Sequence, residues 1–191
     1  MAKLGRKPRP AHVSKAQSRS QILEAARRVA TRDGARDLSL RAVAAEAGFA
    51  PAALYGYFRG KDDLLLALAA DDLTHLARSM REAGGLRNAA SKALALLGGA
   101  ETMAAASQAL PRQGGSSDAE RLFNGRMIAV LRALSEVSGL PSDNRKNQCD
   151  VVLVAAALTG LALLERSGRL GALGFQPGEI LARLESRFAH P

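Results

Sequence analysis

The sequence predicts an all-α protein in which a small N-terminal helix-turn-helix domain precedes a larger helical domain. Three observations support this prediction. Apolar residues recur at intervals of three and four along most of the chain, as on one face of a helix. Serines precede several of these segments and glycines follow them, which is typical of helix ends. The 191 residues are 47% hydrophobic, enough for a buried core, and the single cysteine, Cys149, allows no intramolecular disulfide.

The N-terminal domain is predicted to contain three helices. The first begins at Ser18 or Ser20, ends at Gly34 and buries the stripe Ile22, Leu23, Ala26, Val29 and Ala30. The second is capped by Ser39, ends at Gly48 and buries Val43, Ala44 and Ala47.

The third helix is predicted to begin at Pro51, because the first turn of a helix does not need the missing N–H of proline. Leu54 and Phe58 lie four residues apart and face inward. Two short helices joined by a turn that contains glycine fit a helix-turn-helix, whose second helix enters the major groove of DNA.

Positive charge is concentrated in the same part of the chain. Residues 1–61 hold 13 of the 27 Lys and Arg but only 4 of the 18 Asp and Glu, so the whole net charge of +9 lies there. A basic unit on a neutral body is typical of a protein that binds a phosphate backbone. A solvated basic tail on an ordinary domain is the alternative.

The N-terminal motifs resemble the DNA-binding domain of the tetracycline-repressor (TetR) family. The resemblance covers about fifty positions and rests on three runs: Ile22-Leu23-Glu24-Ala25-Ala26, Ser39 with Val43 to Phe49, and Leu54 to Leu65. It implies a regulator, usually a repressor, that binds a palindromic operator in double-stranded DNA as a homodimer. It also implies a C-terminal domain that binds a small-molecule effector.

The predicted domains are a flexible basic arm (1–17), the helix-turn-helix domain (18–64) and an effector-binding and dimerisation domain (65–191). The resemblance implies that Ser39 and Arg41 meet the DNA backbone and a base edge. It implies that Tyr55, Tyr57 and Lys61 hold phosphates, a role that suits hydroxyl and ammonium groups.

The tip of the recognition helix departs from the family pattern, because Ala50 replaces the usual Ser or Thr cap. None of the side chains at 50–53 can form a hydrogen bond, so Pro51 and Ala52 are left with apolar contacts to DNA. Base discrimination is therefore expected from Arg41, from DNA shape and from the arm residues Arg6, Lys7 and Arg9. A disordered arm that gives only nonspecific affinity is the alternative.

The C-terminal domain is predicted to contain helices at about 61–82, 117–137, 143–166 and 177–188, with shorter segments between paired glycines. The last two long helices are unusually apolar, which favours a dimer interface over a purely intramolecular core. The predicted dimerisation residues are Val151, Val154, Ala155, Leu158, Leu161, Ile180, Leu181, Leu184 and Phe188.

An apolar or amphipathic effector of unknown identity is expected to contact flexible or aromatic side chains of the middle helices. The candidates are Met103, Phe123, Met127 and Leu131, each of which also fits plain core. No cofactor or metal site is predicted, and the scattered histidines and missing nucleophile motifs argue against an enzyme.

Two further expectations concern location and mode of binding. Residues 1–20 are polar and basic, and the apolar run 151–164 is shorter than a membrane span, so a cytoplasmic protein without membrane association is expected. An architectural DNA binder that responds to no effector is the main alternative to a ligand-responsive repressor.

Overall fold

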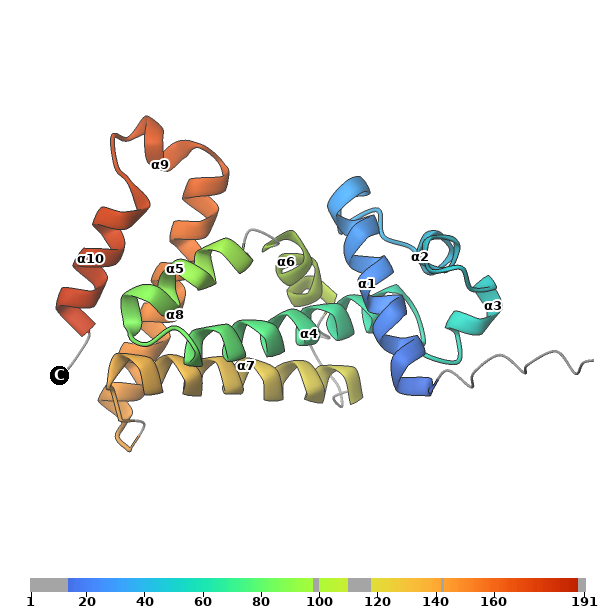
Figure 1. Cartoon of the computed structure of the whole chain (residues 1–191), viewed down its shortest axis with the longest axis horizontal. Helices are drawn as coiled ribbons and strands as arrows, with labels where there is room; N and C mark the ends of the chain where they lie inside the picture. Colours follow the sequence, from blue (N-terminus) through green and yellow to red (C-terminus); the bar gives the residue numbers. More distant parts are fainter. Residues whose placement is uncertain (1–13, 98–99, 110–117, 142, 189–191) are drawn as a thin grey trace, which may run out of the picture.

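The computed structural model describes residues 14–97, 100–109, 118–141 and 143–188, and within these ranges the chain is helical without strands. The helices are α1 (Lys15–Asp33), α2 (Leu40–Ala47), α3 (Pro51–Leu54), α4 (Lys61–Arg81), α5 (Leu86–Leu97), α6 (Ala100–Ala109), α7 (Asp118–Ser138), α8 (Arg145–Arg166), α9 (Arg169–Ala172) and α10 (Pro177–Phe188). In Figure 1, α1 to α3 form one end of the molecule and α5 and α7 to α10 the body.

Helix α1 begins earlier than the sequence predicts. Ser14 caps it by accepting a hydrogen bond from the backbone N–H of Gln17, whose side chain in turn accepts one from the Ser14 N–H. This reciprocal capping box satisfies two backbone donors, so helix formation is favoured from Lys15 onwards. Ser18 is therefore buried within the helix, and the predicted arm boundary at residue 17 lies inside α1.

The other predicted helix ends agree closely with the structure. Ser39 caps α2 through its hydroxyl, and Pro51 occupies the first turn of α3, where Ala50 provides no side-chain cap. Helices α4, α7, α8 and α10 also lie near their predicted positions. The short helix α9 is not predicted by the sequence, because four residues carry too little periodicity to identify it.

Helix α4 belongs to both halves of the protein. Leu64, Leu65 and Leu68 lie in the core of the N-terminal helices, whereas Leu66 and Leu73 lie in the core of the body. A single helix of 21 residues thus passes from one core to the other. The predicted domain boundary at residues 64 and 65 falls within this helix, so no loop separates the domains there.

Helices α6 and α7 contact α4 along the body. Helix α7 packs along α4 (Figure 1), and α6 packs against it near the N-terminal unit. Ala106 of α6 is buried in the core of the body, while its neighbour Ala105 packs against the N-terminal core. Helix α6 therefore touches both cores as well.

The residues of the predicted dimerisation stripe all contact the core of the protomer. Five of its members, Val151, Val154, Leu158, Leu161 and Leu181, are buried in the core of the protomer itself. The other four pack partly buried against that core: Ala155, Ile180, Leu184 and Phe188. Because α8 is apolar nearly all round, its periodicity could not distinguish the inner face from the outer one.

The outer face of α8 is apolar and exposed. Leu153 is 57% exposed and Leu163 is 64% exposed, and Val152 lies on the same surface. By length and composition, α8 is also the one helix among the described residues that could cross a membrane. Core helices pass the same test, and the inner face of α8 lies in the core of the body.

Candidate nucleic-acid interface

The turn between α2 and α3 is set by Gly48. This residue adopts the left-handed conformation, with φ of 73° and ψ of 27°, and its N–H donates to the carbonyl groups of Ala44 and Ala45. The N–H of Phe49 also donates to the Ala44 carbonyl, at 2.9 Å. These bonds satisfy the last carbonyl groups of α2 and redirect the chain, so α3 begins only three residues later.

The first turn of α3 projects a small apolar surface into solvent. Pro51, Ala52 and Ala53 are exposed, while Leu54 is fully buried beneath them. The tip therefore offers methyl and methylene groups, which can contact thymine methyl groups but cannot form hydrogen bonds with base edges. The sequence-based description of this tip agrees with the structure.

Helix α2 contributes a cap and a cation beside that tip. The Ser39 hydroxyl accepts a hydrogen bond from the Ala42 N–H at 3.1 Å, which leaves its own hydrogen free to donate. Arg41 is exposed in the first turn of α2. Within α2, only Arg41 and Glu46 carry side chains that can form hydrogen bonds, and Glu46 is paired with Arg28 and Arg32.

The two predicted tyrosines differ in their surroundings. Tyr55 is 65% exposed directly after α3, so its hydroxyl is accessible to a phosphate. Tyr57 is half-buried and meets Phe49 edge to face, with ring centroids 6.4 Å apart and an interplanar angle of 78°. The ammonium of Lys15 lies 6.0 Å from the Tyr57 ring centre. Helix α1 therefore brings a cation to the same surface, a contribution that the predicted residues did not include.

Lys61, at the first position of α4, is held in place by an earlier loop. Its ammonium donates to the backbone carbonyl of Arg36, in the loop between α1 and α2. An ammonium carries three hydrogens, so two remain for phosphate oxygens. The exposed cations Arg36 and Arg59 lie on the loops before α2 and α4 and add to the positive charge.

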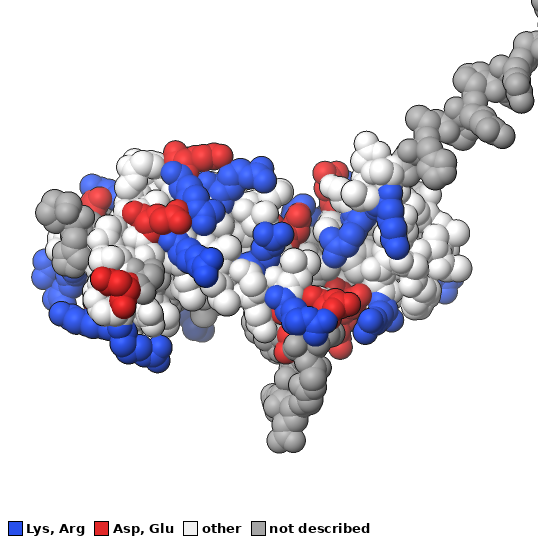
Figure 2. Space-filling view, turned by 90° about the horizontal axis from the view of Figure 1, so that it is seen from below, with Lys and Arg blue, Asp and Glu red and all other residues white. Residues whose placement is uncertain are grey.

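Part of the positive charge of α1 is neutralised within the protein. The carboxylate of Glu46, on α2, accepts from Arg28 Nε at 2.7 Å and from Arg32 Nη1 at 3.1 Å. The hydrogen bond from Arg28, followed by that from Arg32, lowers the pKa of Glu46 below its ordinary value. Arg28 and Arg32 thus join α1 to α2. Figure 2 shows basic and acidic side chains lying next to one another on one face of the molecule.

A second ion-pair cluster joins α1 to α4. Arg27 Nη2 lies 2.9 Å from an oxygen of Asp71 and 2.6 Å from an oxygen of Asp72, and Arg27 Nε adds a bond of 3.1 Å to Asp72. Burial raises the pKa of Asp72, although the hydrogen bonds from Arg27 oppose that rise. Sequence reasoning missed this cluster, for which the adjacent aspartates in an otherwise apolar stretch of α4 were the available signal.

Other predicted site residues lie away from this surface or outside the described residues. Arg6, Lys7 and Arg9 lie outside them, as does the side chain of Met103. Phe123 of α7 is buried in the core of the body, and Met127 and Leu131 pack partly buried against it. Three of the four effector candidates therefore lie on one inward face of α7.

The comparisons with known proteins agree with this geometry. Residues 22–68 match the family model of bacterial regulatory proteins of the tetR family. Over 68 residues the chain is 43% identical to a nicotine-responsive transcriptional repressor, HdnoR, of Paenarthrobacter nicotinovorans. That match covers 36% of this chain and 35% of the repressor, so it spans about a third of the length of either protein.

Solved structures resemble the fold over nearly the whole chain. A TetR transcriptional regulator from Rhodococcus sp. RHA1 superposes with a TM-score of 0.66 at 19% identity, covering 92% of this chain and 97% of its own. The transcriptional regulator FadR from Bacillus subtilis, in complex with stearoyl-CoA, gives a TM-score of 0.58 at 16% identity, covering 89% and 97%. At these identities the likeness concerns the fold alone.

Proposed function

We propose that the chain is a bacterial transcriptional regulator of the tetR family, which binds a palindromic operator as a homodimer and represses transcription from it; the family match over residues 22–68 and the repressor relative support this. The observation that carries the proposal is the surface formed by α2, the Gly48 turn and α3. It presents an exposed helix tip together with Arg41, Tyr55 and Lys61. A helix-turn-helix dimer reads two half-sites in successive major grooves, which leads to a palindromic site.

The proposed contacts divide into two kinds. Arg41 reads a base edge, while Pro51 and Ala52 contact apolar groups in the major groove. Ser39, Tyr55, Tyr57 and Lys61 hold phosphates and fix the register of the protein on the duplex. Arg6, Lys7 and Arg9 follow the minor groove beside it.

The proposed dimer interface uses the outer face of α8. Val152, Leu153 and Leu163 form an exposed apolar surface there, and Ala156 and Gly160 are small enough for close approach of a second helix. Exposed apolar surface of this kind is typical of an interface between protein chains. Dimerisation through α8 would also place two reading surfaces on one assembly.

The body is proposed to bind a small apolar or amphipathic effector that lowers DNA affinity. Phe123, Met127 and Leu131 on the inner face of α7 are the proposed contacts, together with Met103 of α6. The relative HdnoR is named as nicotine-responsive, and the fold neighbour FadR was solved with stearoyl-CoA, so related proteins respond to or bind organic molecules. Effector and DNA must then weaken each other's binding by the same factor.

Selection of binding sites from random double-stranded DNA tests the proposal. The full chain is expected to enrich a sequence with two inverted half-sites whose centres lie about one helical turn, or a multiple of it, apart. Enrichment without inverted symmetry, or no enrichment over the starting pool, would contradict it. The second outcome is the one expected of an architectural binder that recognises only the phosphate backbone.

A further inference from the structure

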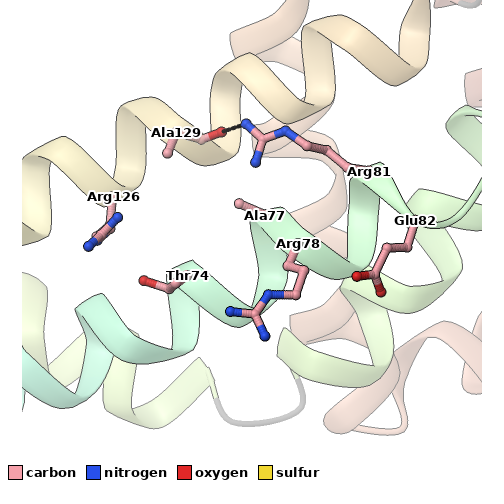
Figure 3. Close-up of a pocket in the computed structure, with 7 residues that line it drawn as sticks. All are labelled: Thr74, Ala77, Arg78, Arg81, Glu82, Arg126 and Ala129. Carbon is pink, nitrogen blue, oxygen red and sulfur yellow. Dashed lines mark hydrogen bonds between the residues drawn. The ribbon is translucent and has the colours of Figure 1, made fainter.

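A hollow opens between α4 and α7 on the surface of the body, about 340 Å³ in volume. Two small residues, Ala77 of α4 and Ala129 of α7, line it and leave the space between the helices unfilled (Figure 3). Its polar lining consists of three arginines, Thr74 and Glu82. We call this hollow the α4–α7 groove.

The three arginines of the groove, Arg78, Arg81 and Arg126, differ in their hydrogen bonds and ion pairs. The Nε of Arg81 donates to a Glu136 oxygen at 2.8 Å, and its Nη2 donates to the Ala129 carbonyl at 3.5 Å. Among the residues that the structure describes, neither Arg78 nor Arg126 forms an ion pair with an acidic side chain. Figure 3 shows these two guanidinium groups extending from different helices, Arg78 from α4 and Arg126 from α7.

The charge of the groove favours a negatively charged ligand. The positive charge of Arg81 is compensated by Glu136, so Arg78 and Arg126 face only one further carboxylate of the lining, that of Glu82. The hydroxyl of Thr74 donates to the Ala70 carbonyl at 2.8 Å and is thereby engaged within α4. The donors left for a ligand are guanidinium N–H groups, which match the geometry of carboxylate and phosphate oxygens.

We propose that the α4–α7 groove binds a small organic anion, with its carboxylate or phosphate between Arg78 and Arg126 and its apolar part against Ala77 and Ala129. The volume lies at the lower end of the range of small-molecule sites, about 300–1,000 Å³. This site is distinct from the proposed effector contacts Phe123, Met127 and Leu131, because those side chains face the core. The proposal concerns binding to the protein alone and stands whether or not the chain binds an operator.

Binding of model anions to the full chain, in the absence of DNA, tests the groove. Phenyl phosphate and benzoate represent the two oxyanions, and benzyl alcohol is a neutral control of similar shape. We expect titration calorimetry to detect saturable binding of at least one anion and none of benzyl alcohol. The stronger of the two anions identifies the oxyanion that the groove prefers.

Charge-removing variants locate the site. Arg126→Gln and Arg78→Gln are each expected to weaken anion binding by about tenfold or more, because a hydrogen bond to a charged group is lost. Both arginines are exposed, so the fold should be retained, and circular dichroism checks this. Arg132→Gln removes an exposed arginine of α7 outside the groove lining and is expected to leave binding unchanged.

Three results would overturn the proposal. The first is the absence of saturable binding of either anion in the millimolar range. The second is equal binding of benzyl alcohol, which would indicate an apolar site without charge recognition. The third is that Arg132→Gln weakens anion binding as much as Arg78→Gln and Arg126→Gln do. That result would attribute the binding to the general positive charge of the protein.

Discussion

Arg41 and Tyr55 both project from the helix-turn-helix into solvent, but they offer DNA different chemistry. A guanidinium can donate to two acceptors on the edge of one guanine. A phenol hydroxyl donates one hydrogen bond, and because every nucleotide carries a phosphate, that bond does not depend on the base sequence. Because the side chains of the tip itself cannot form hydrogen bonds, little else on α2 and α3 competes with Arg41 for sequence reading. On the proposed interface, Arg41 would therefore contribute mainly to specificity and Tyr55 mainly to general affinity.

Replacing Arg41 is expected to reduce specificity more than general affinity. Arg41→Gln should weaken binding to the selected site by about 5- to 150-fold, since a good bidentate base contact is worth about 1–3 kcal/mol. Binding to random DNA should change much less. Fluorescence anisotropy titrations of both duplexes at one salt concentration measure the difference.

The matched comparison is Tyr55→Phe, which removes only a hydroxyl. It should weaken binding to selected and random DNA alike, by about 2- to 10-fold, because a phosphate contact carries no sequence information. An equal loss on both duplexes for Arg41→Gln would contradict its role as the base reader.

At the scale of elements, the turn between α2 and α3 depends on a backbone conformation rather than on packing. A Cβ built on Gly48 would meet no atom within 4 Å, so an alanine there fits sterically but must adopt φ of 73°. Gly48→Ala should therefore lower the free energy of unfolding by about 1–2 kcal/mol. Urea denaturation followed by circular dichroism measures the change.

Gly125→Ala provides a control of opposite sign. Gly125 lies within α7, and its surroundings leave open space for a Cβ. An alanine is favoured over glycine in a helix, so this variant should stabilise the protein by up to about 1 kcal/mol. If Gly48→Ala stabilised the protein as well, the left-handed turn would not be a constraint on the sequence.

The bridge between α1 and α2 should make the N-terminal unit sensitive to acid. The pKa of Glu46 is lowered in the folded state by Arg28 and Arg32, so the folded protein binds this proton less tightly than the unfolded chain. Its contribution to stability is present above the unfolded pKa and is lost as the pH falls through the folded pKa. Glu46→Gln should lower Tm at pH 7 and flatten the decrease of Tm below about pH 5.

Thermal unfolding at a series of pH values tests the role of Glu46. Glu24→Gln removes an exposed carboxylate of α1 that lies outside the bridge and serves as the matched control. A Glu24→Gln profile as flat as that of Glu46→Gln would assign the acid sensitivity to total charge instead.

Local signals in the sequence predict most helix ends and fail where two signals compete. Ser39, Gly48 and Pro51 each act through one adjacent turn, so the sequence alone is enough. The start of α1 differs from its prediction because Ser18 and Ser20 also fit a helix cap, whereas the capping box of Ser14 depends on Gln17. The Arg27 cluster joins residues 44 and 45 positions apart, a separation that no local pattern encodes.

At the scale of the whole molecule, the exposed apolar face of α8 predicts self-association. Leu153→Glu places a charge on that face and should shift the protein from dimer to monomer in sedimentation equilibrium. Leu96→Glu makes the same change at an exposed leucine of α5 and should leave the association state unchanged. A dimer that tolerates Leu153→Glu would place the interface elsewhere.

The sequence predicts that α8 carries more apolar surface than one inward face needs, but it does not predict which side of α8 faces outward. Both stripes of α8 are apolar, and the packing of α5, α7, α9 and α10 against it decides that Val154 and Leu158 lie inside. The same holds for the α4–α7 groove, whose arginines come from two helices that lie far apart in the chain.

Helix α4, shared by both cores, would transmit a change of angle in the body to the N-terminal helices. Its 21 residues span about 31 Å, so a tilt of about 5° about its C-terminal end would displace its N-terminal end by about 3 Å. Arg27, bonded to Asp71 and Asp72 near the middle of this helix, would carry α1 along with it. A displacement of that size is comparable to one base-pair step of the duplex, so a small change of angle in the body would misplace α3 on the proposed operator.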